Sequence, residues 1–430
     1  MKINKGSKSN SPLYLALFWF IAIGYFQSIN QSSSQIIEEK DYVEFKGIVV
    51  SEDSNSLLEF ANISVNETNI TIVANADGEF LLKVPKSDLD KSVTFAYLGY
   101  KNKVIQLSNF SPTNNKIVLV ESVTNLPEIN VISKDPNALI GELMKSRRTN
   151  SIDKPIIMKG FYRESIKKRR TYASLSEAVV VVYKKPFVSN SKSYVKLDKL
   201  RKSTNYKKID TLVIKLQGGP YNTLNIDMIE NNDLFFNDDI FEYYKFTFDK
   251  TISIDDRITY VVRFEPNGYV SIPLFYGKLY IDAETSALSK AFFSLNLDDQ
   301  KKASKYFVKK KPAKADVLPI RADYRVEYKI NNGHWFYNYS RIELSFKIDW
   351  TKKIFNSIYH ITIEKAITDW KINDKNENLK FRERLRSNVI LNDEASGFFD
   401  SDFWGEYNVI EPDKSIENAI KKIKRHLNRS

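Results

Sequence analysis

The chain has 430 residues, a net charge of +12 and no cysteine. Without cysteine, disulfides, thiol catalysis and Cys-ligated metals are excluded, and the length suffices for more than one hydrophobic core. The basic residues are spread along the chain, and the tight clusters at residues 167–170 (KKRR) and 309–311 (KKK) are short. We therefore expect solvated loops or attraction to an anionic membrane surface, and no nucleic-acid partner.

Residues 1–35 have the pattern of an export signal. Lys2, Lys5 and Lys8 precede an apolar run at residues 13–26, which is short for a membrane span, and a polar stretch follows. We expect export to the periplasm or the outer membrane, with loss of the first 27 to 35 residues. An uncleaved N-terminal anchor is the alternative. A lipoprotein anchor is excluded because no cysteine follows the run.

Residues 41–121 show the pattern of a β-sandwich. Ile63 and Val65 alternate with polar residues, as in a half-buried strand. Asp77 and Gly78 form a strong turn signal, because glycine accepts positive φ, and Gly99 between two aromatic residues indicates a bend or a close approach of the backbone.

The order of the segments 45–50 (FKGIVV), 58–65 (LEFANISV), 75–80 (NADGEF) and 95–100 (FAYLGY) resembles the carboxypeptidase regulatory-like domain. That domain is a transthyretin-like β-sandwich, common at the start of cell-envelope proteins of the Bacteroidota type. The resemblance implies an accessory module without catalytic residues. Asp77 could serve as a calcium ligand, but the pattern favours a turn aspartate that binds its own backbone.

Residues 122–150 are predicted to be a linker followed by a helix. Asp135 is a good N-cap and Pro136 a good first helical residue. An apolar stripe at helical spacing follows, and we expect it to pack on a sheet; it consists of Leu139, Ile140, Leu143 and Met144.

Residues 154–412 are predicted to form a β-rich domain of successive strands. Apolar and polar residues alternate in the segments 324–330 and 342–348, and Asn331, Asn332 and Gly333 form a hairpin turn. Further strands are predicted at 258–265, 276–282, 288–295 and 358–370. One apolar and one polar face per strand predicts a large curved antiparallel sheet or half-barrel, solvated on one side. Residues 413–430 predict a helix that closes one end of this sheet with the stripe Ile416, Ile420, Ile423 and Leu427.

Further blocks resemble the larger Bacteroidota proteins that carry this module. They are residues 160–164 (GFYRE), 175–179 (LSEAV), 277–282 (GKLYID) and 402–412 (DFWGEYNVIEP). This resemblance implies an exported β-rich protein. The strand-and-turn step at residues 277–282 is also similar to that of periplasmic lipoprotein carriers, which enclose an acyl chain in a half-barrel.

Signals for catalysis are missing from the sequence. A zinc peptidase needs a histidine and a glutamate a few residues apart, and His334, His360 and His426 lack that spacing. The sequence contains no Gly-x-Ser-x-Gly motif, and residues 218–220 (GGP) are not a phosphate loop. Acidic pairs such as Asp298 and Asp299 are read as solvated turns. We therefore predict no catalytic residue, cofactor or metal site. Residues 210–212 (DTL) fit a short O-glycosylation pattern.

Four residues are candidates for polar or ligand contacts. Arg163 and Glu164 could form a buried polar site or serve in a structural ion pair. Phe403 and Trp404 could bind a ligand or plug the end of the sheet before the final helix.

The main hypothesis is a non-enzymatic envelope protein, with the sandwich as a docking module and the sheet as a binding scaffold. The alternatives are a carrier or sensor of a lipid or other hydrophobic ligand, and a hydrolase of unrecognised type. An envelope protein and a hydrophobic or glycan ligand are the expected classes of partner, and the oligomeric state is open. A filled core would favour the scaffold, an apolar inner cavity the carrier, and converging carboxylates the hydrolase.

Overall fold

The computed structural model describes residues 40–122, 135–187, 189, 193–204, 226–230, 241–254, 257–268, 272–308, 315–351, 356–386 and 403–427. Tyr42–Ser430 forms one compact unit, apart from Met1–Asp41. Several predictions from the sequence lie outside the described residues: the export signal, the extended piece at 125–131, the segments 210–212, 218–220 and 309–311, and the side chains of Ile423 and Leu427. Among the described residues, no helix is both long and apolar enough to cross a membrane.

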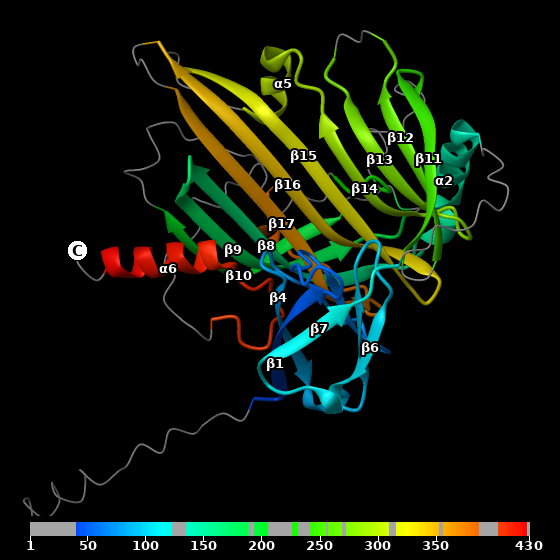
Figure 1. Cartoon of the computed structure of the whole chain (residues 1–430), viewed down its shortest axis with the longest axis vertical. Helices are drawn as coiled ribbons and strands as arrows, with labels where there is room; N and C mark the ends of the chain where they lie inside the picture. Colours follow the sequence, from blue (N-terminus) through cyan, green and yellow to red (C-terminus); the bar gives the residue numbers. More distant parts are fainter. Residues whose placement is uncertain are drawn as a thin grey trace, which may run out of the picture. The chain divides into compact units, whose positions relative to one another are not determined.

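The N-terminal region is a sandwich of two sheets (Figure 1). One sheet has the order β4 (Glu79–Pro85), β1 (Tyr42–Ser51), β7 (Asn115–Leu119). The other has the order β3 (Thr71–Val73), β2 (Asn62–Val65), β5 (Ser92–Ala96), β6 (Lys103–Gln106). The alternation seen in the sequence turns Ile63, Leu82 and Phe95 into the core between the sheets. This is the predicted β-sandwich.

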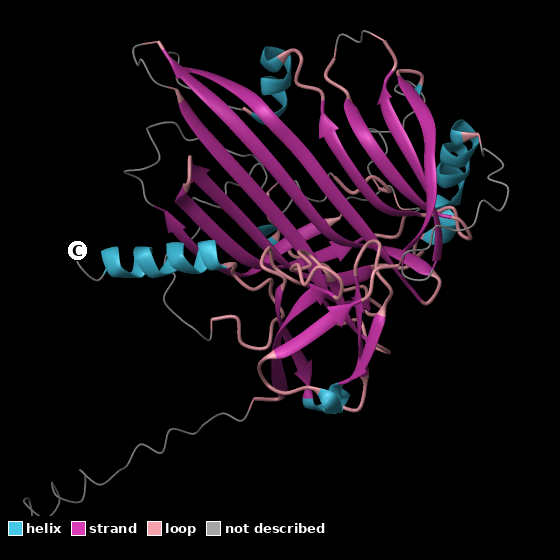
Figure 2. Cartoon of the chain, viewed as in Figure 1, coloured by secondary structure: helices cyan, strands magenta, loops and turns pink. Residues whose placement is uncertain are grey.

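The second sheet is antiparallel throughout and has ten strands (Figure 2). It is curved and open, which confirms the predicted fold class. Its order is β10 (Tyr194–Thr204), β9 (Thr171–Lys184), β8 (Ile156–Lys168), β17 (Ser357–Ile372), β16 (His334–Trp350), β15 (Ala315–Asn331), β14 (Leu288–Leu295), β13 (Phe275–Asp282), β12 (Arg257–Pro266), β11 (Tyr244–Ile254).

The turn between β15 and β16 is the predicted hairpin. Asn331 pairs with His334, and the two residues between them, Asn332 and Gly333, have φ of 49° and 76°. Positive φ at both positions is the requirement of a tight turn whose twist matches that of the strands, which explains the Asn-Gly sequence.

The two faces of the ten-stranded sheet have different partners. We call the face that packs against α2 (Pro136–Asn150) the inner face. Leu139, Ile140 and Leu143 of α2 join its apolar cluster, as predicted, and the Asp135 carboxylate caps the helix by accepting from Asn137 N at 3.0 Å. α5 (Gln300–Phe307) packs on β15.

The opposite, outer face is covered where β8, β9, β16 and β17 lie side by side. Phe161 and Val179 of the sheet pack there with Phe60 and Val73 of the sandwich. Residues 403–413, the closing segment, cover the same surface with Trp404, Val409 and Ile410. The prediction of one solvated face is therefore wrong at these strands, because alternation reveals a polar face without revealing whether water or protein covers it.

The C-terminal helix α6 (Lys414–Leu427) lies against β9. Its Ile416 packs on Leu175, which is on the same face of β9 as Glu177 and Val179. The helix therefore contacts the outer face. The sequence predicts a helix that closes one end of the sheet, and this prediction is wrong. An apolar stripe shows that a helix needs a partner, but not which surface supplies it.

Candidate functional site

Arg163 and Glu164, the adjacent candidates on β8, point to opposite faces of the sheet. Successive residues of a strand alternate, so Arg163 belongs to the outer face with Phe161, and Glu164 to the inner face with Tyr162. Both side chains are buried. The two residues therefore belong to different sites and do not form one polar site together.

Arg163 is the centre of a buried ionic cluster on the outer face. Its Nε donates to Glu177 Oε1 at 2.6 Å, and its Nη1 lies 3.7 Å from Glu364 Oε2. Its Nη2 donates to the carbonyl of Ile410 in the closing segment at 2.7 Å. The guanidinium thus joins two neighbouring strands to the closing segment. This arrangement corresponds to the second alternative given for Arg163, a structural ion pair.

The ionic cluster extends along the sheet from both carboxylates. Glu177 also accepts from Arg201 of β10, at 2.6 and 2.8 Å, and Glu364 accepts from Arg341 of β16 at 2.7 Å. Burial by itself raises the pKa of Glu177, but Arg163 and Arg201 outweigh it and hold that pKa below its usual value. The carboxylate is therefore charged and paired at neutral pH.

A second ionic group joins the sandwich to the outer face. Glu327 of β15 is paired with Arg325 and with Lys290 of β14, and it accepts from Asn62 Nδ2 of the sandwich at 2.9 Å. The Phe60 ring lies under the guanidinium of Arg341, 4.7 Å from ring centroid to Cζ. Polar and cation–π contacts together fix this domain contact.

The closing segment holds Phe403 and Trp404 against the outer face. Trp404 is buried and meets Phe161 edge to face at 5.6 Å, and Phe403 packs on Trp404 at 4.8 Å. Arg201 lies 4.6 Å from the centroid of the Trp404 ring. Both aromatic residues contribute to the packing of the closing segment on the strands, Trp404 as a buried and Phe403 as a half-buried side chain.

The Asp77-Gly78 turn also contacts the C-terminal part of the chain. The backbone-binding role predicted for Asp77 belongs to Asn75, whose Oδ1 accepts from the amides of Asp77 and Glu79 at 2.9 Å. Asp77 Oδ2 instead accepts from the amide of Lys414 at 2.8 Å, at the start of α6. Gly78 has φ of 67°, as its place in the turn predicts.

Gly99, the predicted bend, has φ of 86°. A Cβ on this residue would meet no atom within 4 Å, so its backbone conformation and not a close contact explains the glycine.

These contacts surround a known module. Residues 45–131 match the family model of the CarboxypepD_reg-like domain. This regulatory-like domain is not catalytic. Its contacts with Glu327 and Arg341 form a domain interface on the outer face.

Comparison of the structure with solved structures finds likenesses that are weak in geometry. A DUF1329 family protein from Desulfovibrio piger is 11% identical, with 56% of this chain and 95% of that chain covered and a TM-score of 0.25. Lipovitellin, in a structure on its lipid–protein interactions, is 7% identical, with 59% and 28% covered and a TM-score of 0.27. Among curated proteins none matches this chain. At these TM-scores the likenesses carry no argument about function.

The inner face contains a polar patch within its apolar cluster. Glu164 lies there beside Tyr162, whose hydroxyl donates to Glu164 Oε2 at 3.0 Å. Burial raises the pKa of Glu164 to about 7, while the Tyr162 hydrogen bond lowers it. A carboxyl with such a pKa is half protonated at neutral pH, unlike the carboxylates of the outer face.

Lys365 lies in the same patch, directly opposite Tyr162 in the pairing of β17 with β8. Its side chain is fully buried, and among the described residues its Nζ has no hydrogen-bond partner. Burial lowers the pKa of this amine to about 7, with Asp227 acting in the opposite direction. The amine lies 4.8 Å from the centroid of the Tyr337 ring.

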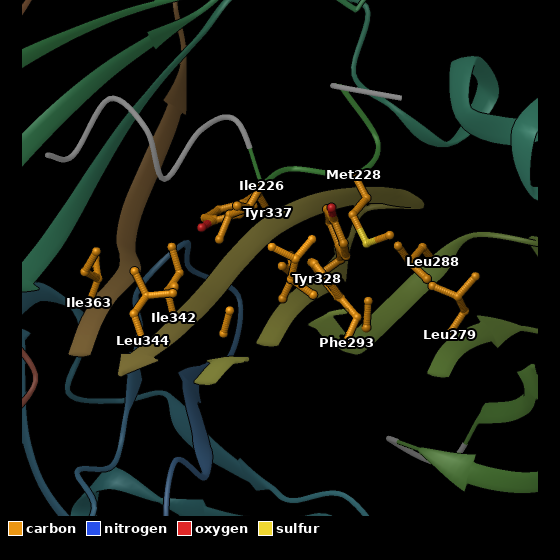
Figure 3. Packing of buried hydrophobic residues seen from close by; sticks show 14 of the residues in the cluster. Ile226, Met228, Leu279, Leu288, Phe293, Tyr328, Tyr337, Ile342, Leu344 and Ile363 are labelled. Carbon is orange, nitrogen blue, oxygen red and sulfur yellow. The ribbon is translucent and has the colours of Figure 1, made fainter. Parts of the chain in front are cut away.

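Residues 226–230 cross the inner face beside this patch. Figure 3 shows Ile226 and Met228 lying near Tyr337, Tyr328 and Leu288. Asp227 accepts from the Tyr328 hydroxyl at 2.9 Å, and Lys184 bridges Asp227 at 3.7 Å and Glu230 at 2.9 Å.

A pocket opens between α2, residues 226–230 and the inner face. It is partly open to solvent and large enough to hold ordered water. The lining combines apolar and aromatic side chains with polar and charged ones, among them Leu143, Arg147, Lys184, Asp227, Trp335 and Tyr337. A concave site of this mixed character suits an amphiphilic ligand.

Sequence reasoning missed Lys365 and Asp227. Lys365 does carry a signal, because it continues the alternating row of Ile361 and Ile363 on the apolar face of β17. A lysine in such a row is unusual and marks a buried polar site. Asp227 carries no such signal, because it alternates with Ile226 and Met228 as a solvated polar residue would.

Proposed function

We propose that this chain is a non-enzymatic, exported envelope protein that works as a binding scaffold. In this proposal the regulatory-like domain braces the outer face of the ten-stranded sheet, and the inner face is the binding surface. The observation that carries it is the buried contact of Arg163 with Glu177, Glu364 and Ile410, which uses the outer face to join sheet and closing segment.

The different roles proposed for the two faces follow from what covers each face. On the outer face, the sandwich and the closing segment bury Phe161, Val179 and Trp404. A partner could reach these strands only by displacing a bonded domain. The inner face has its opening beside α2, where the pocket lies.

A carrier of a hydrophobic ligand is the second candidate function. It is favoured by the extent of the apolar cluster on the inner face, to which all ten strands contribute or pack, together with the pocket. The scaffold is favoured by the packing of the inner face, where side chains such as Leu279, Phe293 and Phe346 are buried in one cluster.

The proposed location rests on the sequence. The basic and apolar residues before residue 27 suit an export signal, and the net charge of +12 suits an anionic envelope surface.

Cell fractionation with intact-mass measurement of the native protein tests this function, together with turnover assays on peptide, ester and glycoside substrates. The proposal expects envelope recovery, a mass lacking the first 27 to 35 residues, and no turnover with or without chelator. Recovery from the cytoplasm would contradict the location. Turnover that a pocket variant such as Asp227→Asn abolishes would establish the hydrolase alternative.

A further inference from the structure

The amine of Lys365 is a buried polar group that lacks an acceptor. It is 0% exposed, and no hydrogen-bond partner for Nζ exists among the described residues. Leaving a buried donor unsatisfied costs about 1–3 kcal/mol, and more for a charged group. Most buried polar groups are satisfied, so an orphaned amine of this kind indicates a binding site or a special role.

The pocket and this amine share Tyr337 as a neighbour. Tyr337 lines the pocket, and its ring centroid is 4.8 Å from Lys365 Nζ. Asp227, Glu230 and Lys184 also line the pocket, and each acts electrostatically on Lys365. A charged group placed in the pocket therefore affects the protonation of this amine.

The charge of the pocket selects an anionic head group, of which a carboxylate is the simplest. Arg147, Lys154 and Lys185 add positive charge to the lining beyond the group formed by Lys184, Asp227 and Glu230. Apolar side chains such as Leu143, Ile152 and Leu288 offer surface to an apolar body.

We propose that this pocket binds an amphiphilic carboxylate whose head group is held by the positive charge of the lining, and that the buried amine of Lys365 responds to that charge through Tyr337 and Asp227. The inference rests on the proposal that the inner face is the binding surface, and it adds the class of ligand and the residue that responds to it.

Binding and protonation are coupled in this site. The titratable groups that face Lys365 or share its patch are Tyr162 and Glu164 from β8, Tyr337 from β16, Lys184 from β9, and Asp227 and Glu230 from residues 226–230. An anion in the pocket favours the protonated amine, so binding takes up a proton. Because the pKa of Lys365 is about 7, we expect carboxylate affinity to fall about tenfold between pH 6 and pH 8.

Calorimetric titration of the full-length chain with decanoate and with decan-1-ol, at pH 6, 7 and 8, tests the inference. Decanoate stays ionised throughout this range, and the alcohol keeps the apolar body without the charge. We expect one decanoate per chain, with the tenfold loss toward pH 8, and weaker binding of decanol that does not depend on pH.

Two lysine variants separate the site from general charge. Lys365→Met keeps the length and volume of the side chain and should abolish the pH dependence of decanoate binding. Lys347→Met alters a lysine of β16 that pairs with Asp349 at the surface. This variant should leave the pH dependence of decanoate binding unchanged.

The outcomes separate the two proposals. Equal affinity for decanoate and decanol, or a pH dependence that persists in Lys365→Met, would overturn the carboxylate inference and leave the inner face as a binding surface. Binding of neither compound to a folded protein would contradict the inner face as the binding surface as well.

Discussion

Glu177 accepts from Arg163 across the β8–β9 pair at 2.6 Å, in an interior position where Arg163 is 2% and Glu177 is 0% exposed. Arg201 approaches the same carboxylate from β10. Glu177 therefore lies between two arginines beneath the closing segment. It connects three strands to the cover of the outer face, and its replacement should affect the whole contact.

We predict that Glu177→Gln destabilises the protein by about 3–5 kcal/mol, because it leaves two buried guanidinium groups without their carboxylate. Urea unfolding measures the change. Glu417→Gln is the matched control, since Glu417 pairs with Lys421 on exposed α6 at 3.4 Å, and it should cost less than about 0.5 kcal/mol. Equal losses in the two variants would show that the cluster does not hold the outer face together.

Glu327 should make the domain contact sensitive to acid. Burial alone raises its pKa, but Arg325 and Lys290 lower it to about 2. A carboxylate with a depressed folded-state pKa adds stability above its unfolded value of 4.5, and this is lost as the pH falls toward about 2. The loss should reach about 3 kcal/mol. Unfolding followed from pH 5 to pH 2 measures it, and Glu327→Gln should be less stable at pH 5 and lose less on acidification.

Lys365 should have the opposite pH signature. Its folded-state pKa is about 7 and its unfolded value 10.5, so the unfolded chain binds more protons between these pH values and stability rises with pH. Each pH unit adds up to about 1.4 kcal/mol. Lys365→Met should be more stable than the wild type at pH 7 and should gain less between pH 7 and pH 10. A parallel pH profile of the two proteins would mean that the lysine is not buried in its neutral form.

The α6 contact should contribute measurably to stability through one side chain. Ile416 is buried against Leu175, and Ile416→Ala should cost about 2–4 kcal/mol. Lys421→Ala, on the exposed face of the helix, is the control. Deletion of the chain after Pro412 should lower the melting temperature at least as much as Ile416→Ala. An unchanged melt after deletion would make α6 a free tail.

Gly78 and Gly99 offer a matched pair of turn positions. Both have positive φ, but a Cβ on Gly78 would lie 3.0 Å from the carbonyl of Val49, whereas one on Gly99 would meet nothing within 4 Å. Gly78→Val should therefore destabilise by more than about 1 kcal/mol, and by more than Gly99→Val, where only the strain of positive φ applies. Thermal unfolding compares them. A smaller loss at Gly78 would show that the turn relaxes.

The sequence predicted the elements of this fold better than their partners. Ile342, Leu344 and Phe346 fix a strand by alternation alone, and Asn332 with Gly333 fixes its turn, because these signals are local. The burial of Glu177 could not be predicted, because its pattern is that of a solvated strand face, and its cover comes from residues more than two hundred positions later. The division into domains at residues 121, 154 and 412 stays a prediction.

The candidate residues show the same limit. Arg163 and Glu164 were selected as a pair from one motif, yet strand geometry sends them to opposite faces. Lys365 was overlooked although it stands in an apolar row. A polar residue at an apolar position of a strand is thus a more useful signal here than two adjacent charges.

Scanning calorimetry of the intact chain tests whether the regulatory-like domain is fixed to the outer face. We expect one transition at pH 7, with equal calorimetric and van't Hoff enthalpies, and we expect it to split or broaden in Glu327→Gln. Two separate transitions in the wild-type protein, one with the enthalpy of a domain the size of residues 45–131, would contradict this expectation.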